Sequence, residues 1–528
     1  MLIHTDLMTM QSKRSNQQAE EAIQKAIQNN SQTLDLSSMG LIELPESLGQ
    51  LNQLTALNLR NNELISLPEF FKNLSQLTEL NLNRNIIKSL PEFIGQFQNL
   101  VQLNLESNLL ETLPESFGQL KQLTHLEIDF NRLISLPESF WNLKQLKKLS
   151  LKNARSVITS EGLKKLSQLT YLCLNRNALN QLPKSIGNLK QLKTLDLSEN
   201  HLTSLPESFG NLKKLKNLEL GNSQLRSLPE SFGNLKQLKS LYLGSNQLTS
   251  LPESFGTLKQ LMELNLANNE LTSLPKSFGD LKQLKELNLG NNGLTSLPES
   301  LGNLEQLEKL YLRDNQLTLL PESIGSITRL NNLKLTNNLL TSLPESIGNL
   351  KKLDTLNLEG NQLTSLPESI GELEQLTELD LEANELTSLP ESLGTLEQLR
   401  ELDLANNNLT SLPISIAQLG NLSSLRVIGN QLGPEIEAAL NDGTETFLEY
   451  LNADTQEEQV ILNEAKLILI GEGGVGKTSL LSAIVGAPWV ENRDTTHGVE
   501  IRQFTEEESA SGTSISFNGW DFGGQPLY

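Results

Sequence analysis

A glycine-rich segment near the end of the 528-residue sequence has the residue types that hold a phosphate chain. It reads Gly471-Glu-Gly-Gly-Val-Gly-Lys477-Thr478 and matches the full Walker A pattern. The glycines let backbone N–H groups converge on phosphate oxygens, Lys477 would neutralise the β and γ phosphates, and the Thr478 hydroxyl would bind Mg²⁺. The candidate nucleotide-binding residues of this loop are Gly471, Gly473, Gly474, Val475, Gly476, Lys477, Thr478 and Ser479.

The residues on either side of the loop favour this interpretation. Lys466–Ile470 is a short apolar run typical of a buried parallel strand, and Ser479–Val485 has a helical pattern. The glycines also match the dinucleotide fingerprint G-x-G-x-x-G, but that kind of loop has no use for the Lys-Thr pair that ends this one. A strand, a loop and a helix in this order therefore predict a P-loop.

Four positions beyond the loop could complete a nucleotide site. The Thr496 hydroxyl could bind Mg²⁺ and sense the γ-phosphate, while Asp521 suits an outer-shell Mg²⁺ contact. The Gly524 amide could reach the γ-phosphate, and Gln525, the candidate catalytic residue, could orient the attacking water. Asp521 also begins a D-F-G tripeptide, but no histidine in the sequence begins the H-R-D motif that a kinase needs. The order of the motifs is that of a Ras-like G domain.

The elements expected to carry these positions are strands. Val499–Phe504 and Thr513–Trp520 have strand-like patterns, and the polar segment Thr505–Gly512 is interpreted as the hairpin that joins them. The sequence therefore predicts the N-terminal half of a P-loop α/β domain.

A 23-residue repeat occupies most of the chain ahead of this domain. Successive prolines are 23 residues apart, with one double step across Ser160. A representative period, Leu228–Ser250, contains L-x-x-L-x-L-x-x-N-x-L, the leucine-rich-repeat signature. The sixteen prolines in this register are Pro45, Pro68, Pro91, Pro114, Pro137, Pro183, Pro206, Pro229, Pro252, Pro275, Pro298, Pro321, Pro344, Pro367, Pro390 and Pro413. We expect about 18 turns of a solenoid with a curved parallel sheet on its concave face.

The repeat pattern assigns a role to each position. Leu241 and Leu243 alternate along a short strand, so both are expected to point into the core. Asn246 is expected to hydrogen-bond backbone groups where the chain leaves the sheet. Met39, Ala154 and Ser223 replace this asparagine in three turns. The turn around Ala154 departs further from the pattern, which leaves a bend, a recognition site or neutral drift open.

Both ends of the stack need a cover because a single turn cannot bury its own leucines. Ser15–Asn30 has an amphipathic helical pattern and is predicted to cap the first turn. Pro434–Leu440 and Thr444–Leu451 are predicted to be short helices that close the other end. The expected domains are a cap (1–30), leucine-rich repeats (31–433), a second cap with a linker (434–463) and a partial nucleotide-binding domain (464–528).

Composition narrows the class of protein. The formal net charge of −21 argues against sequence-independent binding to nucleic acid or to an anionic membrane. The single cysteine, Cys173, excludes an internal disulfide and is typical of a reducing compartment. The sequence shows neither a secretory signal nor an apolar stretch of about eighteen residues that could span a membrane. We therefore expect a cytoplasmic location.

Outward-pointing strand residues are the expected partner-binding surface of the repeats, so we predict a protein partner on the concave face. The last two turns carry a group of carboxylates in this position. This group fits either a basic partner or an ordinary solvated acidic face. Its members are Glu378, Asp380, Glu382, Glu401 and Asp403.

The combined pattern resembles the bacterial Roco proteins. Leucine-rich repeats run through a short linker into the Glu464–Leu480 segment with its P-loop, and Trp520-Asp-Phe-Gly-Gly-Gln525 follows. In that family a Ras-like Roc GTPase domain precedes a dimerising COR domain, and some members carry a Ser/Thr kinase domain. The resemblance implies GTP and GDP as ligands, Mg²⁺ as cofactor, and slow hydrolysis coupled to rearrangement of a homodimer.

Two family features lie beyond the last residue of this sequence, Tyr528. The guanine-reading N/T-K-x-D motif and the COR domain both come later in the family, so guanine over adenine is implied by the resemblance alone. We expect a GTP-binding and GTP-hydrolysing signalling switch that recognises a protein through its repeats. Two alternatives remain, a pure interaction module with a non-functional G-domain stub and a P-loop ATPase with repeats.

Overall fold

The structure is a computed structural model of the whole chain. It describes residues 2–154, 160–433, 436, 439–440, 443–455, 464–469, 480, 499–507 and 514–522. The chain forms two compact units, residues 1–451 and 452–528, and each is described by itself.

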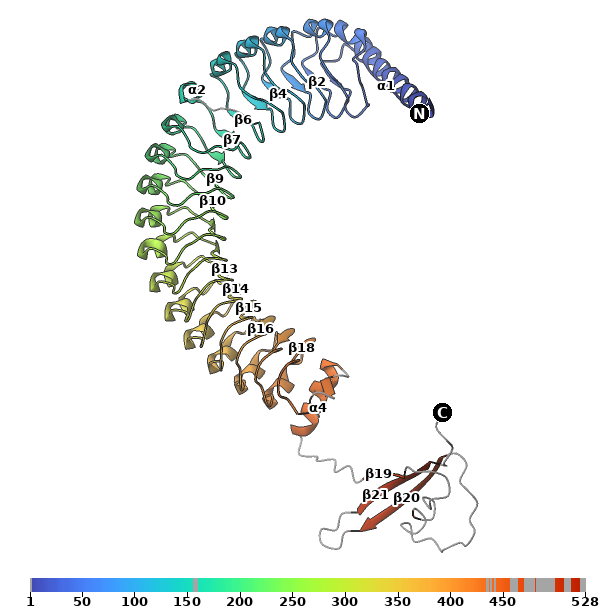
Figure 1. Cartoon of the computed structure of the whole chain (residues 1–528), viewed down its shortest axis with the longest axis vertical. Helices are drawn as coiled ribbons and strands as arrows, with labels where there is room; N and C mark the ends of the chain where they lie inside the picture. The colour runs from blue at the N-terminus through green and yellow to red at the C-terminus, as the bar shows by residue number, and fades with distance from the viewer. Residues whose placement is uncertain are drawn as a thin grey trace. The chain divides into compact units, whose positions relative to one another are not determined.

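The first unit is a solenoid built on one parallel sheet of 18 strands. The strands line the inner face of a curved stack, and short 3₁₀ helices lie along its outer face (Figure 1). The strands are β1 (Thr33–Asp35), β2 (Ala56–Asn58), β3 (Glu79–Asn81), β4 (Gln102–Asn104), β5 (His125–Glu127), β6 (Lys148–Ser150), β7 (Tyr171–Cys173), β8 (Thr194–Asp196), β9 (Asn217–Glu219), β10 (Ser240–Tyr242), β11 (Glu263–Asn265), β12 (Glu286–Asn288), β13 (Lys309–Tyr311), β14 (Asn332–Lys334), β15 (Thr355–Asn357), β16 (Glu378–Asp380), β17 (Glu401–Asp403) and β18 (Ser424–Arg426).

Each 3₁₀ helix begins directly after one of the repeated prolines, which is extended and serves as its N-cap. Most of these helices contain a glycine, which lets successive turns pack closely because it has no side chain. A Cβ atom at Gly256 would overlap the Ser277 carbonyl group of the next turn. The helices are η1 (Glu46–Gln50), η2 (Glu69–Asn73), η3 (Glu92–Gln96), η4 (Glu115–Gln119), η5 (Glu138–Asn142), η6 (Lys184–Asn188), η7 (Glu207–Asn211), η8 (Glu230–Asn234), η9 (Glu253–Thr257), η10 (Lys276–Asp280), η11 (Glu299–Asn303), η12 (Glu322–Ser326), η13 (Glu345–Asn349), η14 (Glu368–Glu372), η15 (Glu391–Thr395) and η16 (Ile414–Gln418).

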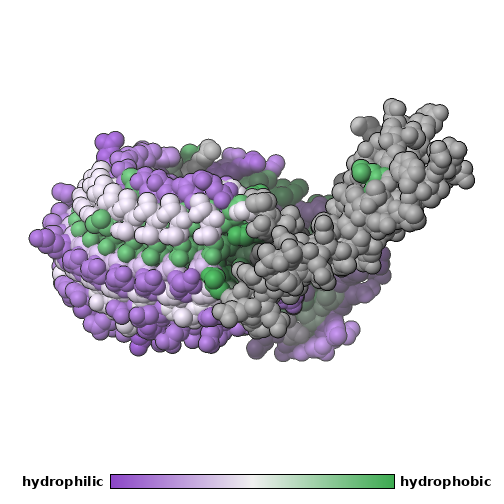
Figure 2. Space-filling view, turned by 90° about the horizontal axis from the view of Figure 1, so that it is seen from below, coloured by the Kyte–Doolittle hydropathy of each residue, from purple (hydrophilic) through white to green (hydrophobic). Residues whose placement is uncertain are grey.

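Neighbouring strands pair with no shift between repeats, so residues at the same repeat position form columns along the solenoid. Leu241 of β10, for example, pairs with Leu218 on one side and Leu264 on the other. The columns are visible as bands of like hydropathy along the surface (Figure 2). Leu241 and Leu243 are completely buried, as the repeat pattern predicts. Full burial of one leucine side chain contributes about 1.5–3 kcal/mol.

A second column, of asparagines, satisfies the backbone where each strand ends. The Asn246 amide donates to the carbonyl groups of Leu220 and Leu243, both at 2.9 Å, and its oxygen accepts the N–H of Leu225 at 3.0 Å. One side chain therefore connects its own turn with the preceding one and replaces backbone hydrogen bonds that the curved chain cannot make. The predicted role of this asparagine is confirmed.

Helix α1 (Leu2–Gln28) covers the first turn. Ala19, Ile23 and Ala26 of this helix are buried in the core of the solenoid, as the predicted amphipathic cap requires. The helix begins 13 residues before the predicted start at Ser15, and the reason is that the preceding segment has neither proline nor glycine to end it. At the other end, helix α4 (Thr444–Thr455) buries Phe447 completely. Most of the predicted helix Pro434–Leu440 lies outside the described residues.

The irregular turn has a short α-helix, α2 (Ser160–Lys165), in place of a 3₁₀ helix, between β6 and β7 (Figure 1). Trp141 is buried, and its indole ring occupies the space where a Cβ atom of Gly162 would stand. Its ring also packs edge-on against Phe140 at 5.3 Å between centroids. Trp141 is therefore a core residue, which argues against a recognition role for it.

The second unit contains a three-stranded sheet in the order β19-β21-β20. The strands are β19 (Glu464–Leu469), β20 (Val499–Glu507) and β21 (Ser514–Phe522). The predicted strands are present, although β20 is longer than expected and includes the first residues of the predicted hairpin segment. No helix in the described part of the chain is long and apolar enough to cross a membrane.

The asparagine column leads to a first prediction. Ser223 takes the asparagine position after β9, and its buried hydroxyl oxygen has no hydrogen-bond partner. We expect Ser223→Asn to restore the missing hydrogen bonds and to raise the free energy of unfolding by about 1–2 kcal/mol. Guanidinium unfolding of the whole chain, followed by circular dichroism, measures the change.

The reciprocal substitution is the matched control for this experiment. Asn246→Ser removes three hydrogen bonds at the equivalent position and is expected to lower the unfolding midpoint. An unchanged midpoint in both variants would contradict the role assigned to the asparagine column.

Candidate functional site

The backbone of the second unit brings two motif-bearing strands together. β19 runs parallel to β21, with Leu469 in register with Asp521 and Ile468 with Trp520. The carboxyl ends of these two strands therefore lie at the same edge of the sheet. In α/β folds ligands bind outside the carboxyl ends of parallel strands.

The third strand reaches the same edge from the opposite direction. β20 runs antiparallel to β21, and Val499, its first residue, is in register with Phe522. Asp521 thus lies on the central strand, with Leu469 on one side and Glu500 on the other. Three segments of chain meet here, because β19 and β21 end at this edge and β20 starts from it.

The predicted site residues adjoin these strand ends in the sequence. Gly471 follows the last residue of β19 by two positions, Thr496 precedes the first residue of β20 by three, and Gly524 follows the last of β21 by two. Residues 471–479, Thr496, Gly524 and Gln525 lie outside the described residues. Asp521 is the one predicted site residue whose backbone position is described, and it lies at this edge.

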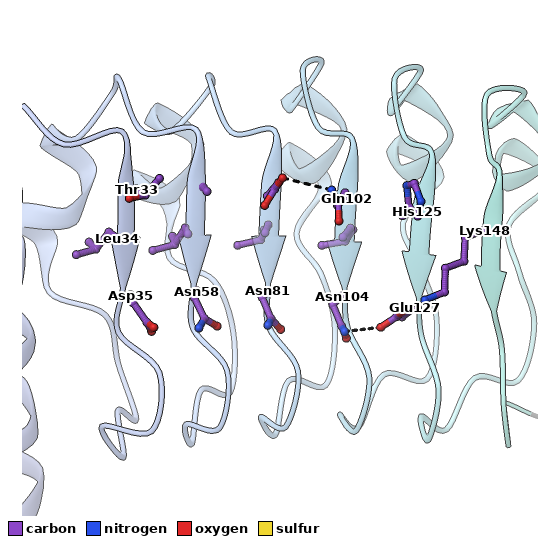
Figure 3. A pocket seen from close by; sticks show the side chains of 15 residues that line it. Thr33, Leu34, Asp35, Asn58, Asn81, Gln102, Asn104, His125, Glu127 and Lys148 are labelled. Carbon is purple, nitrogen blue, oxygen red and sulfur yellow. Dashed lines mark hydrogen bonds and ion pairs between the residues drawn. The ribbon is translucent and has the colours of Figure 1, made fainter.

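The concave face of the repeats offers a second kind of site. A shallow hollow of about 440 Å³ lies over β1 to β6, lined by strand residues that point out of the sheet (Figure 3). Asn58, Asn81 and Asn104 form a row across three strands. Each amide oxygen accepts a backbone N–H two residues later, which holds the side chain in place.

The far end of this hollow is charged. Asn104 donates to Glu127 at 2.6 Å, and Lys148 makes an ion pair with the same carboxylate (Figure 3). The floor is therefore rich in oriented amides and carboxylates, and its leucines, such as Leu57, are almost fully buried. Such a surface suits polar contacts with a polypeptide more than binding of an apolar molecule.

The concave face over β16 to β18 carries the predicted carboxylates together with one base. The column that contains Asp380 and Asp403 continues with Arg426 on β18. The Arg426 guanidinium makes ion pairs with Asp403 and with Glu382, the latter at 3.4 Å. Arg426 thus adds one base to a column of these carboxylates, because β18 forms a further full strand of the sheet.

Burial and neighbouring carboxylates give one of these acids an unusual pKa. Burial raises the pKa of Asp380 to about 6, with further increases from the negative charges of Asp403, Glu359 and Glu382. The Glu382 backbone N–H donates to this carboxylate and opposes the rise. Asp380 therefore changes charge nearer to neutral pH than an ordinary aspartate does.

Models of two protein families match the two units of the chain. The model of the leucine-rich repeat region matches residues 72–169, 153–223, 210–292 and 322–453, and the model described as Ras of Complex, Roc, domain of DAPkinase matches residues 466–528. The chain belongs to the leucine-rich-repeat family, and its repeats followed by a Roc domain give it a Roco-type architecture.

Two curated relatives have Roc or roco in their names. A Roc-COR-CHAT protease from Runella zeae is 43% identical over 76 residues, which cover 13% of this chain and 8% of that protein. A probable serine/threonine-protein kinase, roco11, from Dictyostelium discoideum is 33% identical over 102 residues, which cover 17% and 6%. The matches thus span less than a tenth of either relative.

Solved structures support the fold of the first unit. The leucine-rich-repeat protein LIC12759 of Leptospira interrogans is 36% identical, with a TM-score of 0.56, and the alignment covers 79% of this chain and 95% of that one. The Arabidopsis receptor kinase HAESA, solved with the peptide hormone IDA and the co-receptor SERK1, is 31% identical with a TM-score of 0.58. That alignment covers 77% of this chain and 75% of the other.

The raised pKa of Asp380 leads to a prediction on stability. Because the folded pKa lies above the unfolded value of 3.8, the folded state binds the proton more tightly, and stability from this group falls as pH rises from about 4 to about 6. Asp380→Asn cannot ionise, so we expect it to stabilise the chain by about 1 kcal/mol more at pH 8 than at pH 4. Urea unfolding at the two pH values measures this difference.

A neighbouring aspartate is the control for this measurement. Asp403→Asn removes one of the negative charges that raise the pKa of Asp380, so the pH dependence of stability that Asp380 causes is expected to be smaller in this variant. An equal effect of Asp380→Asn at both pH values would contradict the raised pKa.

Proposed function

We propose that the chain is the recognition and nucleotide-binding part of a Roco-type signalling switch. In this proposal the Roc domain binds and hydrolyses GTP with Mg²⁺, and the repeats bind a protein partner on their concave face. Homodimerisation through a COR region belongs to the same proposal.

The observation that carries the proposal is the register of β19 with β21. It puts the strand that leads into the Walker A sequence beside the strand that ends in Asp521-Phe522. The match of residues 466–528 to the Roc family and the match to the Roc-COR-CHAT protease support the same assignment.

The donor set fits a magnesium nucleotide. Lys477 offers a cation for the β and γ phosphates, and the hydroxyls of Thr478 and Thr496 are hard oxygen ligands. Asp521 adds a carboxylate from the central strand, and Gln525 would orient the attacking water. When bound, Mg²⁺ would neutralise phosphate charge, and the assigned residues would bind the phosphates and hold the water in line.

The partner proposal rests on the concave face of the repeats. The hollow over β1 to β6 presents oriented amide groups and carboxylates, which are hydrogen-bonding groups for a polypeptide. HAESA, which is similar over most of the repeat region, was solved with a peptide hormone. We extend to this chain only the class of ligand, a protein or peptide.

The nucleotide site has a direct test. We expect Lys477→Ala to abolish binding of a fluorescent GTP analogue in the presence of Mg²⁺, because the substitution removes the charge that opposes the β and γ phosphates. Fluorescence titration of the complete protein measures binding. Lys184→Ala, an exposed residue of the repeats, is the matched control and should bind as the unsubstituted protein does.

The outcomes of this titration separate the two main functions. Unchanged affinity in Lys477→Ala would overturn the site assignment. No nucleotide binding by the unsubstituted protein would leave an interaction module with a non-functional G-domain stub.

Nucleotide preference is tested separately, by competition. We expect unlabelled GTP to displace the fluorescent analogue at a concentration at least about tenfold lower than ATP, because a Ras-like domain reads the guanine base. Equal displacement by ATP and GTP, or stronger displacement by ATP, would favour a P-loop ATPase.

A further inference from the structure

A cluster of lysines lies along one lateral edge of the solenoid, outside the concave face. Each of three neighbouring turns carries one lysine directly before its strand and another three residues earlier, in the loop after its 3₁₀ helix. These turns lead into β8, β9 and β10. The cluster, called here the lysine edge, consists of Lys190, Lys193, Lys213, Lys216, Lys236 and Lys239.

The register of the repeats forces these side chains together. The backbone N–H of Lys216 donates to the carbonyl of Lys193, and that of Lys239 donates to the carbonyl of Lys216, both at 2.8 Å. Adjacent lysines of this column are therefore one strand spacing apart, about 4.8 Å. All six side chains are exposed. The lysine edge is thus a two-by-three array of ammonium groups.

Further along the same columns, lysines form ion pairs with carboxylates. Two turns beyond the array, Lys282 pairs with Glu305 and Lys285 with Glu308, each at 3.5 Å. In both pairs the carboxylate occupies the position of the lysine one turn later. Lys259, between the array and these pairs, binds Asp280 at 3.0 Å.

The lysine edge lacks this compensation. One turn after Lys190 and Lys193 the equivalent positions hold Lys213 and Lys216, so each column continues with the same charge. Within the described part of the chain, no carboxylate forms an ion pair with any of the six lysines. Like charges on directly opposed strand positions repel each other. The net charge of the chain is −21, so the positively charged array is opposite in sign to the molecule as a whole.

We propose that the lysine edge binds an acidic segment of a partner polypeptide. The array extends over two turn spacings, about 10 Å, which three to four residues of an extended chain can follow at about 3.3 Å per residue. The carboxylates of the partner would take the place that Glu305 and Glu308 take further along. This inference does not depend on the nucleotide site or on the concave-face proposal.

The surroundings favour a short acidic peptide over a nucleic acid. Exposed Glu207, Glu230 and Glu253 begin the 3₁₀ helices beside the array, and Glu219 and Glu263 lie on the concave strands. A phosphate backbone that continues beyond the array would meet these carboxylates and the net negative charge. A peptide with a short run of acidic residues would not.

The test uses fluorescein-labelled hexaglutamate as the probe and the whole 528-residue chain. Fluorescence anisotropy at low salt, roughly 50 mM, where screening is weak, is expected to show binding. We expect Lys193→Gln, Lys216→Gln and Lys239→Gln together to weaken it about fivefold or more, because several exposed ion pairs of a few tenths of a kcal/mol are lost. Circular dichroism checks that the variant is folded.

A variant with the same change in net charge is the control. Lys88→Gln, Lys334→Gln and Lys352→Gln together replace three exposed lysines away from the array. This variant is expected to bind hexaglutamate as the unsubstituted chain does. Equal weakening in both variants would mean that net charge alone decides binding, and it would overturn the proposal.

Three other results would also overturn the proposal. One is the absence of hexaglutamate binding by the unsubstituted chain. The second is tighter binding of a single-stranded dT oligonucleotide to the same lysines, which would make the ligand a nucleic acid. The third is a self-associated chain in sedimentation that the triple lysine substitution converts to monomer, which would make the edge a contact between copies.

Discussion

The structure of the repeat unit depends on one constraint, the absence of any shift between neighbouring strands. Leucines stack on leucines, and each asparagine after a strand satisfies backbone groups of two turns at once, as Asn246 does for Leu220 and Leu243. Because all strands share this register, each surface position becomes a column, and any residue type repeated in the sequence becomes a continuous feature of the surface.

This constraint explains why charges of one sign cluster on particular parts of the surface. The acidic column over β16 and β17 arises because Asp380 and Asp403 occupy the same repeat position, and burial together with the charge of Asp403 raises the pKa of Asp380. The lysine edge arises in the same way on the lateral surface. A net charge of −21 thus describes the long-range field of the chain, while binding at short range depends on which columns a partner meets.

The two units present different kinds of surface for function. The repeats offer an extended face whose polar groups are held by their own backbone, as the Asn104 amide is by the Glu106 N–H. The Roc unit has a sheet edge at which the ends of β19 and β21 lie side by side. A recognition surface and a sheet edge that would bind nucleotide are the two parts of the proposed switch.

Much of this could be read from the sequence, because strict periodicity and the Walker A spacing are local patterns. The 23-residue repeat predicted the buried leucines and the role of Asn246. The amphipathic pattern of Ser15–Asn30 predicted the capping helix, and apolar and strand-like patterns predicted the three strands of the Roc unit. Contacts between residues far apart in the sequence decided the rest. They placed Arg426 beside Asp403, made Trp141 a core residue through contact with Gly162, and aligned Leu469 with Asp521. These relations join residues from separate strands or turns, and their distances depend on register and packing, which a local pattern does not contain.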